Sequence, residues 1–157
     1  MAGKKSTSVE KIIIKDEATV LKLRSLGGGT EEGSTVVLHP LEAAFFASRR
    51  VILGEPKKLL KAAGELADER FRVLENLREN GYIAKPSFDS PLLRLYRKGF
   101  RPGEDRTFCI LKVVTKELTP QELQSFCEFA GKLRKDAALA VVGADIVYIK
   151  VSKTKFE

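Results

Sequence analysis

Several side chains between residues 94 and 135 could act together on a phosphate group. The stretch opens with a basic segment whose five cations are Arg94, Arg97, Lys98, Arg101 and Arg106, with Tyr96 and Phe100 between them. Cations bind phosphates, and aromatic rings offer stacking faces for unpaired bases. Lys135 adds a further cation at the end of the stretch. The pattern favours contact with RNA over the alternative, a basic loop that is only solvated.

A strand and a helix must position these side chains. Residues 107–114 are rich in β-forming residues and apolar on both faces, which predicts a central strand. Thr119, Pro120 and Glu122 carry the signature of a capping box, so we expect a helix over residues 120–135. Its predicted apolar face consists of Leu123, Phe126, Cys127, Ala130 and Leu133. Glu128 and Lys135 then share the opposite, polar side of that helix.

Short strands alternate with helices along the chain, which predicts an α/β (α+β) fold with two domains. In a small mixed N-terminal α/β domain, residues 1–63, we expect strands at 9–14, 35–38 and 51–53, and helices at 18–26 and from Pro40 onward. A helical stretch over residues 56–80, broken near Gly64, leads into a nuclease-like second domain, residues 64–157. Its strands are expected at 82–85, 92–96, 107–114, 137–142 and 145–151, in a central mixed sheet flanked by helices.

Other residues with chemical potential have simpler structural explanations. His39 is the one histidine, and it stands at a predicted helix start, where a cap or a surface residue is expected. Residues 27–29 are three glycines with no following Gly-Lys-Ser/Thr, so they predict a flexible turn rather than a phosphate loop. Cys109 and Cys127 lie inside apolar patterns and are expected to be buried free thiols. No metal site and no cofactor are predicted from these residues.

Composition limits the partners of this 157-residue chain. A formal net charge of +7 favours an anionic partner, and nucleic acid is the commonest one. No apolar run approaches the roughly 20 residues that span a bilayer, and residues 1–8 lack the apolar core of a signal peptide, so a cytoplasmic protein is expected. Charged residues make up 31% while asparagine and glutamine are scarce, which hints at a thermophilic protein.

Six segments together resemble one known family. They are residues 38–46, 73–82, 93–96, 130–135, 139–142 and 145–151. Each is degenerate, but their order and spacing are similar to those of the tRNA-splicing endonuclease (tRNA-intron endonuclease) family of archaea and eukaryotes. The resemblance covers nearly the whole chain.

The resemblance implies a metal-free and cofactor-free cleavage of precursor tRNA at the exon–intron junctions. In this family a tyrosine takes the proton of a 2′-OH, a histidine protonates the leaving 5′-oxygen and a lysine balances charge, which leaves a 2′,3′-cyclic phosphate and a 5′-OH. Tyr96 matches the tyrosine and Lys135 the lysine. Arg106 stands where the histidine is expected, and arginine cannot act as an acid near neutral pH. Glu128 stands where catalytic members carry an arginine that clamps a flipped-out base.

With two functional positions lost, the chain resembles the structural subunit of the heterotetrameric archaeal enzymes. Those contain two catalytic and two structural chains, so the implied partners are a catalytic subunit and precursor tRNA. In the family, subunits pair partly through the last strand, and an acidic loop before it enters a basic pocket of the other chain. The matching residues here are Asp145 in the loop and Tyr148 and Lys150 in the strand. A simple β-turn aspartate is the alternative for Asp145.

Two other functions remain open at this point. The chain could be a self-sufficient metal-free endoribonuclease, with Tyr96 as base and Arg106 and Lys135 as electrostatic catalysts, although it lacks an evident general acid. It could also be an RNA-binding or assembly module unrelated to splicing.

Overall fold

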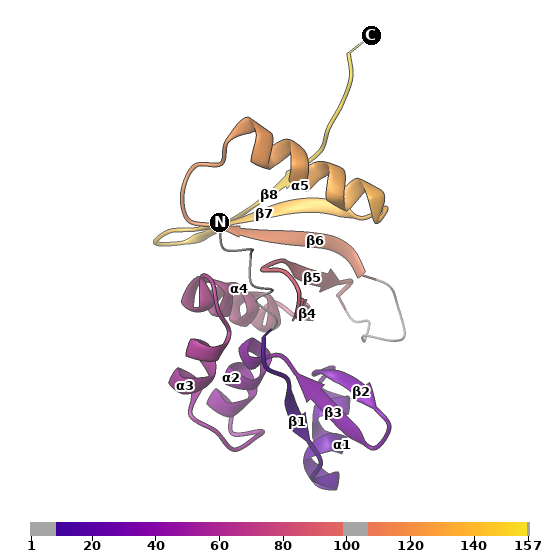
Figure 1. Ribbon diagram of the computed structural model, residues 1–157, viewed down its shortest axis with the longest axis vertical. Coiled ribbons are helices and arrows are strands. Elements are labelled where there is room, and N and C mark those ends of the chain that lie inside the picture. Colours follow the sequence, from indigo (N-terminus) through magenta and orange to yellow (C-terminus); the bar gives the residue numbers. More distant parts are fainter. Residues whose placement is uncertain (1–8, 99–106, 157) are drawn as a thin grey trace, which may run out of the picture. The chain divides into compact units, whose positions relative to one another are not determined.

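The computed structural model describes residues 9–98 and 107–156, and the chain forms two compact units (Figure 1). The first unit contains the residues up to 71 together with 85–91, and the second contains residues 72–84 and those from 92 onward. Helix α4 (Ala67–Glu79) and strand β4 (Ala84–Pro86) therefore contribute residues to both units. The boundary predicted between residues 63 and 64 falls in the turn that precedes α4.

The first unit combines a small antiparallel sheet with helices. Its other elements are β1 (Ile12–Ile14), α1 (Glu17–Ser25), β2 (Thr30–Glu32), β3 (Thr35–Leu38), α2 (Pro40–Ser48) and α3 (Pro56–Ala62). Strand β3 lies between β1 and β2 and is antiparallel to both. Residues 36–38 of β3 are all buried, which explains the apolar run there. Strand β2 was not predicted, because its three residues are exposed and carry no apolar pattern.

The strand predicted at residues 51–53 is wrong. Helix α2 ends at Ser48, and Arg50 takes a left-handed conformation with φ 61°. The Val51 N–H then donates to the Phe46 carbonyl oxygen at 2.8 Å. This segment closes the end of α2 by the usual reversed hydrogen bond of a helix C-terminus, so its backbone is not available to a sheet.

The start of α2 is fixed by two buried side chains, His39 and Glu42. His39 Nδ1 accepts the Leu41 N–H at 3.0 Å, and Glu42 accepts the His39 N–H at 3.5 Å, which completes a capping box. His39 is 0% exposed, so it is a cap but not a surface residue. The second carboxylate oxygen of Glu42 accepts the Gly29 N–H at 3.0 Å. A buried carboxylate is tolerated here because its oxygens have backbone donors.

The glycine turn at residues 27–29 is packed rather than flexible. All three glycines are buried. Lys85 Nζ donates to the Gly29 carbonyl oxygen, and Glu42 accepts from the same residue's N–H. A turn was predicted at this place and is confirmed, but its role is to lock β2 and α2 together.

The second unit is built on a mixed sheet. Among the described residues the strand order is β4-β5-β6-β7-β8, with β5 (Leu93–Tyr96), β6 (Thr107–Val114), β7 (Asp136–Val142) and β8 (Ile146–Val151). Strand β6 is central, as predicted. It pairs antiparallel with β5 and parallel with β7, and β7 pairs antiparallel with β8. The predicted α+β class with a mixed sheet is confirmed.

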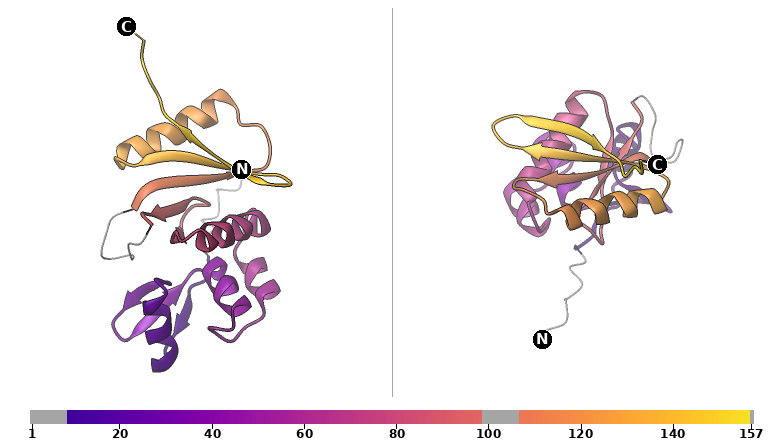
Figure 2. Two further views of the ribbon diagram at one scale, coloured as in Figure 1. Left: turned by 180° about the vertical axis from the view of Figure 1, so that it is seen from behind. Right: turned by 90° about the horizontal axis from the view of Figure 1, so that it is seen from above.

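Helix α5 (Pro120–Lys132) lies along one face of this sheet, and the second-unit part of α4 lies along the other (Figures 1 and 2). The α5 face forms a core of Ile110, Phe126, Ala130 and Ala137. The predicted capping box at Thr119 and Glu122 is present. Of the predicted apolar face, Leu133 is an exception, since it caps the helix and is 44% exposed. In the part of the chain that the structure describes, no helix is long and apolar enough to cross a membrane.

The predicted helix end at residue 135 is wrong, and this changes the description of Lys135. Helix α5 ends at Lys132, and Arg134 has a left-handed φ of 57°. The Lys135 N–H donates back to the Ala130 carbonyl oxygen at 2.9 Å. Lys135 therefore lies in the connection just before β7 and shares no helical stripe with Glu128, because the chain has already turned toward the sheet.

Two glycines allow the packing of the 27–29 turn to be tested separately from backbone strain. An added Cβ at Gly29, φ 68°, would lie 2.4 Å from Val36 Cγ1 and 2.7 Å from the Val37 carbonyl oxygen, whereas at Gly33, φ 62°, it would meet open space. Both alanine variants suffer the left-handed strain of about 1–2 kcal/mol. We expect Gly29→Ala to lose a further ~1–3 kcal/mol of unfolding free energy from overpacking. Urea denaturation measures both variants, and equal losses would contradict the packing described here.

Candidate functional site

The strand pairing of the second unit brings two of the predicted site residues, Tyr96 and Lys135, to one end of the sheet. In the register, Leu95 lies opposite Cys109, and Cys109 lies opposite Asp136. The last residue of β5 is Tyr96, and Lys135 directly precedes the first residue of β7. The carboxyl end of β5 and the amino ends of β6 and β7 thus meet at the same sheet end. The tyrosine and the lysine, far apart in sequence, are presented there together.

Tyr96 is held by the backbone on both sides. Its N–H donates to the Ile83 carbonyl oxygen at 2.9 Å, and on the other side Tyr96 pairs with Thr107 of β6. The register shifts between Leu95 and Tyr96, as it does at a β-bulge or a similar irregularity. Bulges re-aim side chains at sheet rims and are frequent next to functional sites. The phenol is half-buried.

Two of the predicted RNA-binding cations lie against aromatic rings. The Arg97 guanidinium is 5.3 Å from the centre of the Phe108 ring, and Lys98 Nζ is 5.8 Å from that of Tyr82. Such contacts hold a cation on the protein surface. Both side chains are exposed.

Arg94 projects from a different place than Arg97 and Lys98. It is exposed, and it lies opposite Ile110, whose side chain packs beneath α5. Arg94 is therefore on the face of the sheet that carries α5, because directly opposed residues point to the same face. Arg101 and Arg106 were also predicted to bind RNA, and they lie outside the described residues.

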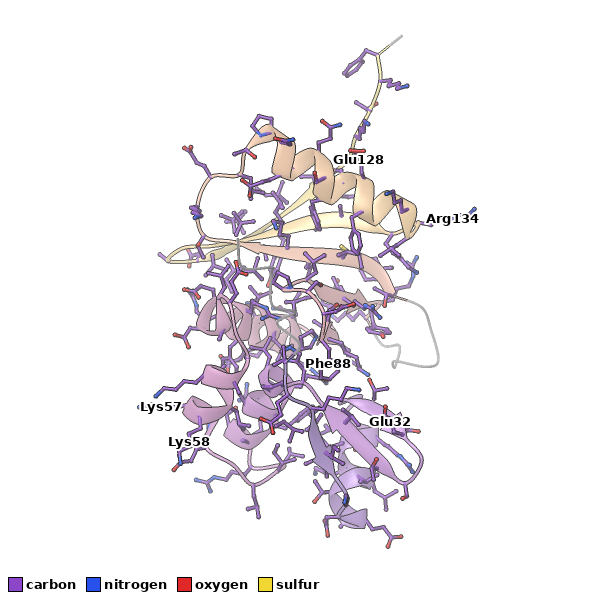
Figure 3. All side chains as sticks on the ribbon, in the orientation of Figure 1. Glu32, Lys57, Lys58, Phe88, Glu128 and Arg134 are labelled. Carbon is purple, nitrogen blue, oxygen red and sulfur yellow. The ribbon has the colours of Figure 1, made fainter. Side chains whose placement is uncertain are left out.

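The end of α5 presents charges of both signs. Glu128 is exposed on the helix and accepts a hydrogen bond from Gln124 Nε2 at 3.3 Å. Arg134 extends outward beyond the end of the helix (Figure 3). Lys135 is half-buried. Of these three residues, Lys135 is the one positioned directly at the start of β7.

His39 does not have the properties of a general acid. It belongs to the first unit, where Nδ1 already accepts a hydrogen bond and the ring lies 5.3 Å from that of Phe88. Burial, with a smaller contribution from the nearby Arg70 cation, lowers the pKa of His39 to about 4. At neutral pH the ring is therefore uncharged, and its protonated form is scarcely populated.

The two cysteines are free thiols, as predicted. Cys109 is buried and Cys127 is half-buried. Burial raises the pKa of Cys109 to about 11, and the negative charge of Asp136 makes a smaller contribution in the same direction. Such a thiol is uncharged at neutral pH and chemically inert. Within residues 9–98 and 107–156, no group of three or more His, Cys, Asp and Glu side chains could hold a metal ion.

The turn between β7 and β8 presents Asp145, and helix α4 holds that turn from below. Arg72 Nη1 donates to the Gly143 carbonyl oxygen at 3.0 Å, and Nη2 donates to the Ala144 carbonyl oxygen at 3.3 Å. The Gly143 N–H donates to the Asp145 carbonyl oxygen at 3.0 Å. The Asp145 side chain is exposed. A fork of two donors fixes the orientation of the turn more firmly than one bond could.

Strand β8 is an edge strand with exposed apolar residues on one face and polar anchors on the other. Val147 and Ile149 are 54% and 45% exposed. Tyr148 donates its hydroxyl to Asn76 Oδ1 at 2.7 Å, and Lys150 Nζ lies 3.5 Å from Asp136 Oδ2. Burial raises the pKa of Tyr148 to about 12, so it remains a donor at neutral pH.

Some of these positioning residues could not be found from the sequence. The roles of Arg72 and Asn76 depend on a helix meeting a turn about seventy residues later in the chain. A further group of cations at residues 49–61 was visible as a charge count, but no motif accompanied it.

These features define a class of protein, a two-unit α+β chain whose second unit carries a tyrosine and a lysine at one end of a mixed sheet. Residues 67–148, just over half of the chain, match the family model for the tRNA intron endonuclease, catalytic C-terminal domain. The chain therefore belongs to the tRNA intron endonuclease family, and the resemblance read from the sequence is confirmed at the level of the family.

Archaeal proteins of hot environments are among the relatives. The chain is 30% identical over 144 residues to a tRNA-splicing endonuclease of Thermococcus kodakarensis, covering 82% of this chain and 83% of that one. It is 29% identical over 143 residues to proteins of the same name from Pyrococcus abyssi and Pyrococcus horikoshii, with 83% of each chain covered.

The burial of His39 predicts a pH dependence of stability. The folded pKa, about 4, lies below the ordinary value of 6.5, so the unfolded chain binds the proton more readily between these values. The contribution is complete above pH ~6.5 and is lost as the pH falls toward ~4, and at ~1.4 kcal/mol per pKa unit the loss between pH 7 and pH 4 is about 3 kcal/mol. Denaturant titrations at pH 7 and pH 4 measure it. The His39→Asn variant keeps a cap acceptor that does not titrate. Its unfolding free energy should therefore fall by that much less between pH 7 and pH 4 than the free energy of the wild type. An equal fall in both proteins would contradict the role of His39.

The fork of Arg72 predicts local order in the Asp145 turn. Arg72→Leu should speed amide hydrogen exchange at residues 143–146 by about 5-fold, since hydrogen bonds from a charged donor at an exposed site contribute about 1 kcal/mol. Arg72→Lys is the matched control, because it keeps the charge but loses the two-pronged geometry. We expect it to exchange nearly as fast as the leucine variant. Exchange at the wild-type rate in both variants would show that Arg72 does not hold the turn.

Proposed function

We propose that this chain is the structural, non-catalytic subunit of a tRNA-splicing endonuclease. It would assemble with a catalytic subunit that carries the missing histidine, in a heterotetramer of two catalytic and two structural chains, and position it on precursor tRNA. The partner would supply the metal-free reaction that leaves a 2′,3′-cyclic phosphate and a 5′-OH.

The state of His39 is the observation that carries this proposal. It is the single histidine of the chain, and it is buried as a helix cap with a pKa of about 4. A general acid must be accessible and have a pKa near the operating pH. Tyr96 and Lys135 retain the base and the cation of the family reaction, but an acid is missing from the set. Arg106 cannot replace it, because a guanidinium does not release its proton near neutral pH.

The charges around the sheet end support a binding role without cleavage. Arg97 and Lys98 are exposed there and Arg94 is exposed on the α5 face of the sheet, so all three could hold phosphates, and we extend this role to Arg101 and Arg106. Glu128 is an exposed carboxylate on α5 and would repel an RNA backbone that came close to it. The catalytic chain would need to bring its own base-clamping groups.

The exposed edge of β8 supports assembly with another chain. An edge strand presents unpaired backbone groups that readily pair with a strand of a partner. Val147 and Ile149 add apolar surface to that edge, and Tyr148 and Lys150 border it. Asp145 stands exposed in the turn that Arg72 holds, where it could enter a basic pocket of the partner.

Cleavage assays on separate and mixed chains test the proposal. The purified chain should leave an intron-bearing tRNA transcript intact, and mixing with a histidine-bearing catalytic chain of the family should produce a 2′,3′-cyclic phosphate end. Tyr96→Phe in this chain should change the rate of the mixture by less than about 2-fold, because this tyrosine would not be the working base. Asp145→Lys should prevent co-purification of the two chains.

A self-sufficient ribonuclease would give the opposite result. If the chain alone cut the transcript to a cyclic phosphate, and Arg106→Ala or Tyr96→Phe abolished this, the non-catalytic role would be wrong. An RNA-binding module unrelated to splicing would bind structured RNA without an intron equally well and would recover no catalytic chain on co-purification.

A further inference from the structure

The first unit carries a cluster of cations that the proposed site does not use. We define this basic corner as Arg49 and Arg50 at the end of α2 and Lys57, Lys58 and Lys61 on α3, all of them exposed. Residues 49–63 contain these five cations and a single carboxylate, Glu55. The segment thus has a net charge of +4, more than half of the +7 of the whole chain.

The backbone brings the two parts of the basic corner together. Helix α2 packs against α3, and the loop between them is short. Ile52 is buried in that loop, at 8% exposure. A Cβ added at Gly54 would lie 3.2 Å from Leu59 Cδ1 and 3.9 Å from Ala47 Cβ, so the loop backbone contacts both helices. The end of α2 and the start of α3 are therefore held side by side.

The three lysines of α3 point to one side. Lys57 and Lys61 are one turn apart, and Lys58 is three residues before Lys61, so all three lie within an arc of about 100°. Leu59 and Leu60 occupy the opposite side and are half-buried. Figure 3 shows Lys57 and Lys58 extending outward from α3. The helix therefore presents a face made of cations.

Some of these cations stand where they weaken the fold. Lys57 and Lys61 are like charges at a spacing of four, which destabilises a helix. Lys57 and Lys58 lie in the first turn, where the helix dipole disfavours cations. Arg50 has φ 61°, a conformation in which glycine is favoured. Lys58 Nζ is 3.3 Å from Glu55, and the Arg49 guanidinium lies 5.1 Å from the centre of the Phe45 ring. The segment still keeps a net positive charge, and cations at positions unfavourable for the fold are typical of a surface that binds an anion.

We propose that the basic corner binds the phosphate backbone of precursor RNA, as a contact additional to the sheet end of the second unit. The ligand follows from charge complementarity, and it rests on the proposed function only in that the RNA is an intron-bearing tRNA. A membrane fits less well, because Leu53, 99% exposed, is a single apolar side chain and the face of α3 beside it is cationic rather than amphipathic.

Fluorescence anisotropy with an end-labelled intron-bearing tRNA transcript tests this on the full chain. Lys57→Gln/Lys58→Gln/Lys61→Gln should weaken binding about 10-fold or more at ~100 mM salt, and should reduce the slope of log affinity against log salt by about 2–3. Lys15→Gln/Lys22→Gln/Lys116→Gln is the matched control, since it removes the same charge from exposed lysines outside the corner. It should change the affinity by less than about 3-fold.

Arg50→Gly separates binding from stability. Glycine adopts a positive φ without strain, so this variant should unfold at a higher temperature than the wild type. It also removes a cation of the basic corner and should weaken RNA binding about 2- to 5-fold. Weaker binding by a more stable protein cannot be attributed to misfolding.

The outcomes distinguish this inference from the proposed function. If the α3 variant and its control bind RNA equally well, the basic corner has no RNA role, and the splicing role stands or falls by the cleavage assay alone. If the α3 variant loses RNA binding while no partner restores cleavage, the corner is confirmed and the splicing role is wrong. Vesicles of phosphatidylcholine with phosphatidylserine provide the other comparison. If the variant with Lys57, Lys58 and Lys61 replaced loses vesicle binding but binds RNA as the wild type does, the RNA assignment is overturned in favour of a membrane.

Discussion

The parallel pairing of β6 with β7 is the constraint on which the second unit depends. Parallel neighbours cannot be joined by a hairpin, so the chain must cross over the sheet, and α5 makes that crossover. The helix is fixed there because Phe126 and Ala130 pack on Ile110. Both strands then begin at the same sheet end, where the antiparallel β5 finishes. Tyr96 and Lys135 come together as a consequence of this topology, whatever chemistry they perform.

The scaffold is independent of the chemistry that the family is named for. The strands and α5 are held by buried apolar residues, and Tyr96 and Lys135 lie at the sheet end, outside that core. A histidine can therefore be absent from the sheet end without loss of the fold. The histidine that the chain does have is a buried cap, where its uncharged form is required. The fold itself therefore places no requirement on a histidine at the sheet end.

The charged residues of the two units are used differently. In the second unit Arg72 holds a turn, Lys150 faces Asp136, and Arg97 and Lys98 lie over aromatic rings. Their positions are fixed by the unit itself, which suits surfaces that must be presented in a defined orientation. The basic corner of the first unit has an excess of cations over carboxylates in its own segment, which suits contact with an external anion.

The sequence by itself determined the features that depend on local chemistry. Strands β3 and β6 begin and end where their β-branched and apolar residues predicted, and the capping box at Thr119 and Glu122 was readable, because a cap acts within one turn of its own helix. Only the tertiary structure decided the burial of His39, the end of α5 before Lys135 and the fork of Arg72. Each of these is set by contacts distant in sequence or by a left-handed turn at an arginine, for which a sequence pattern carries no signal.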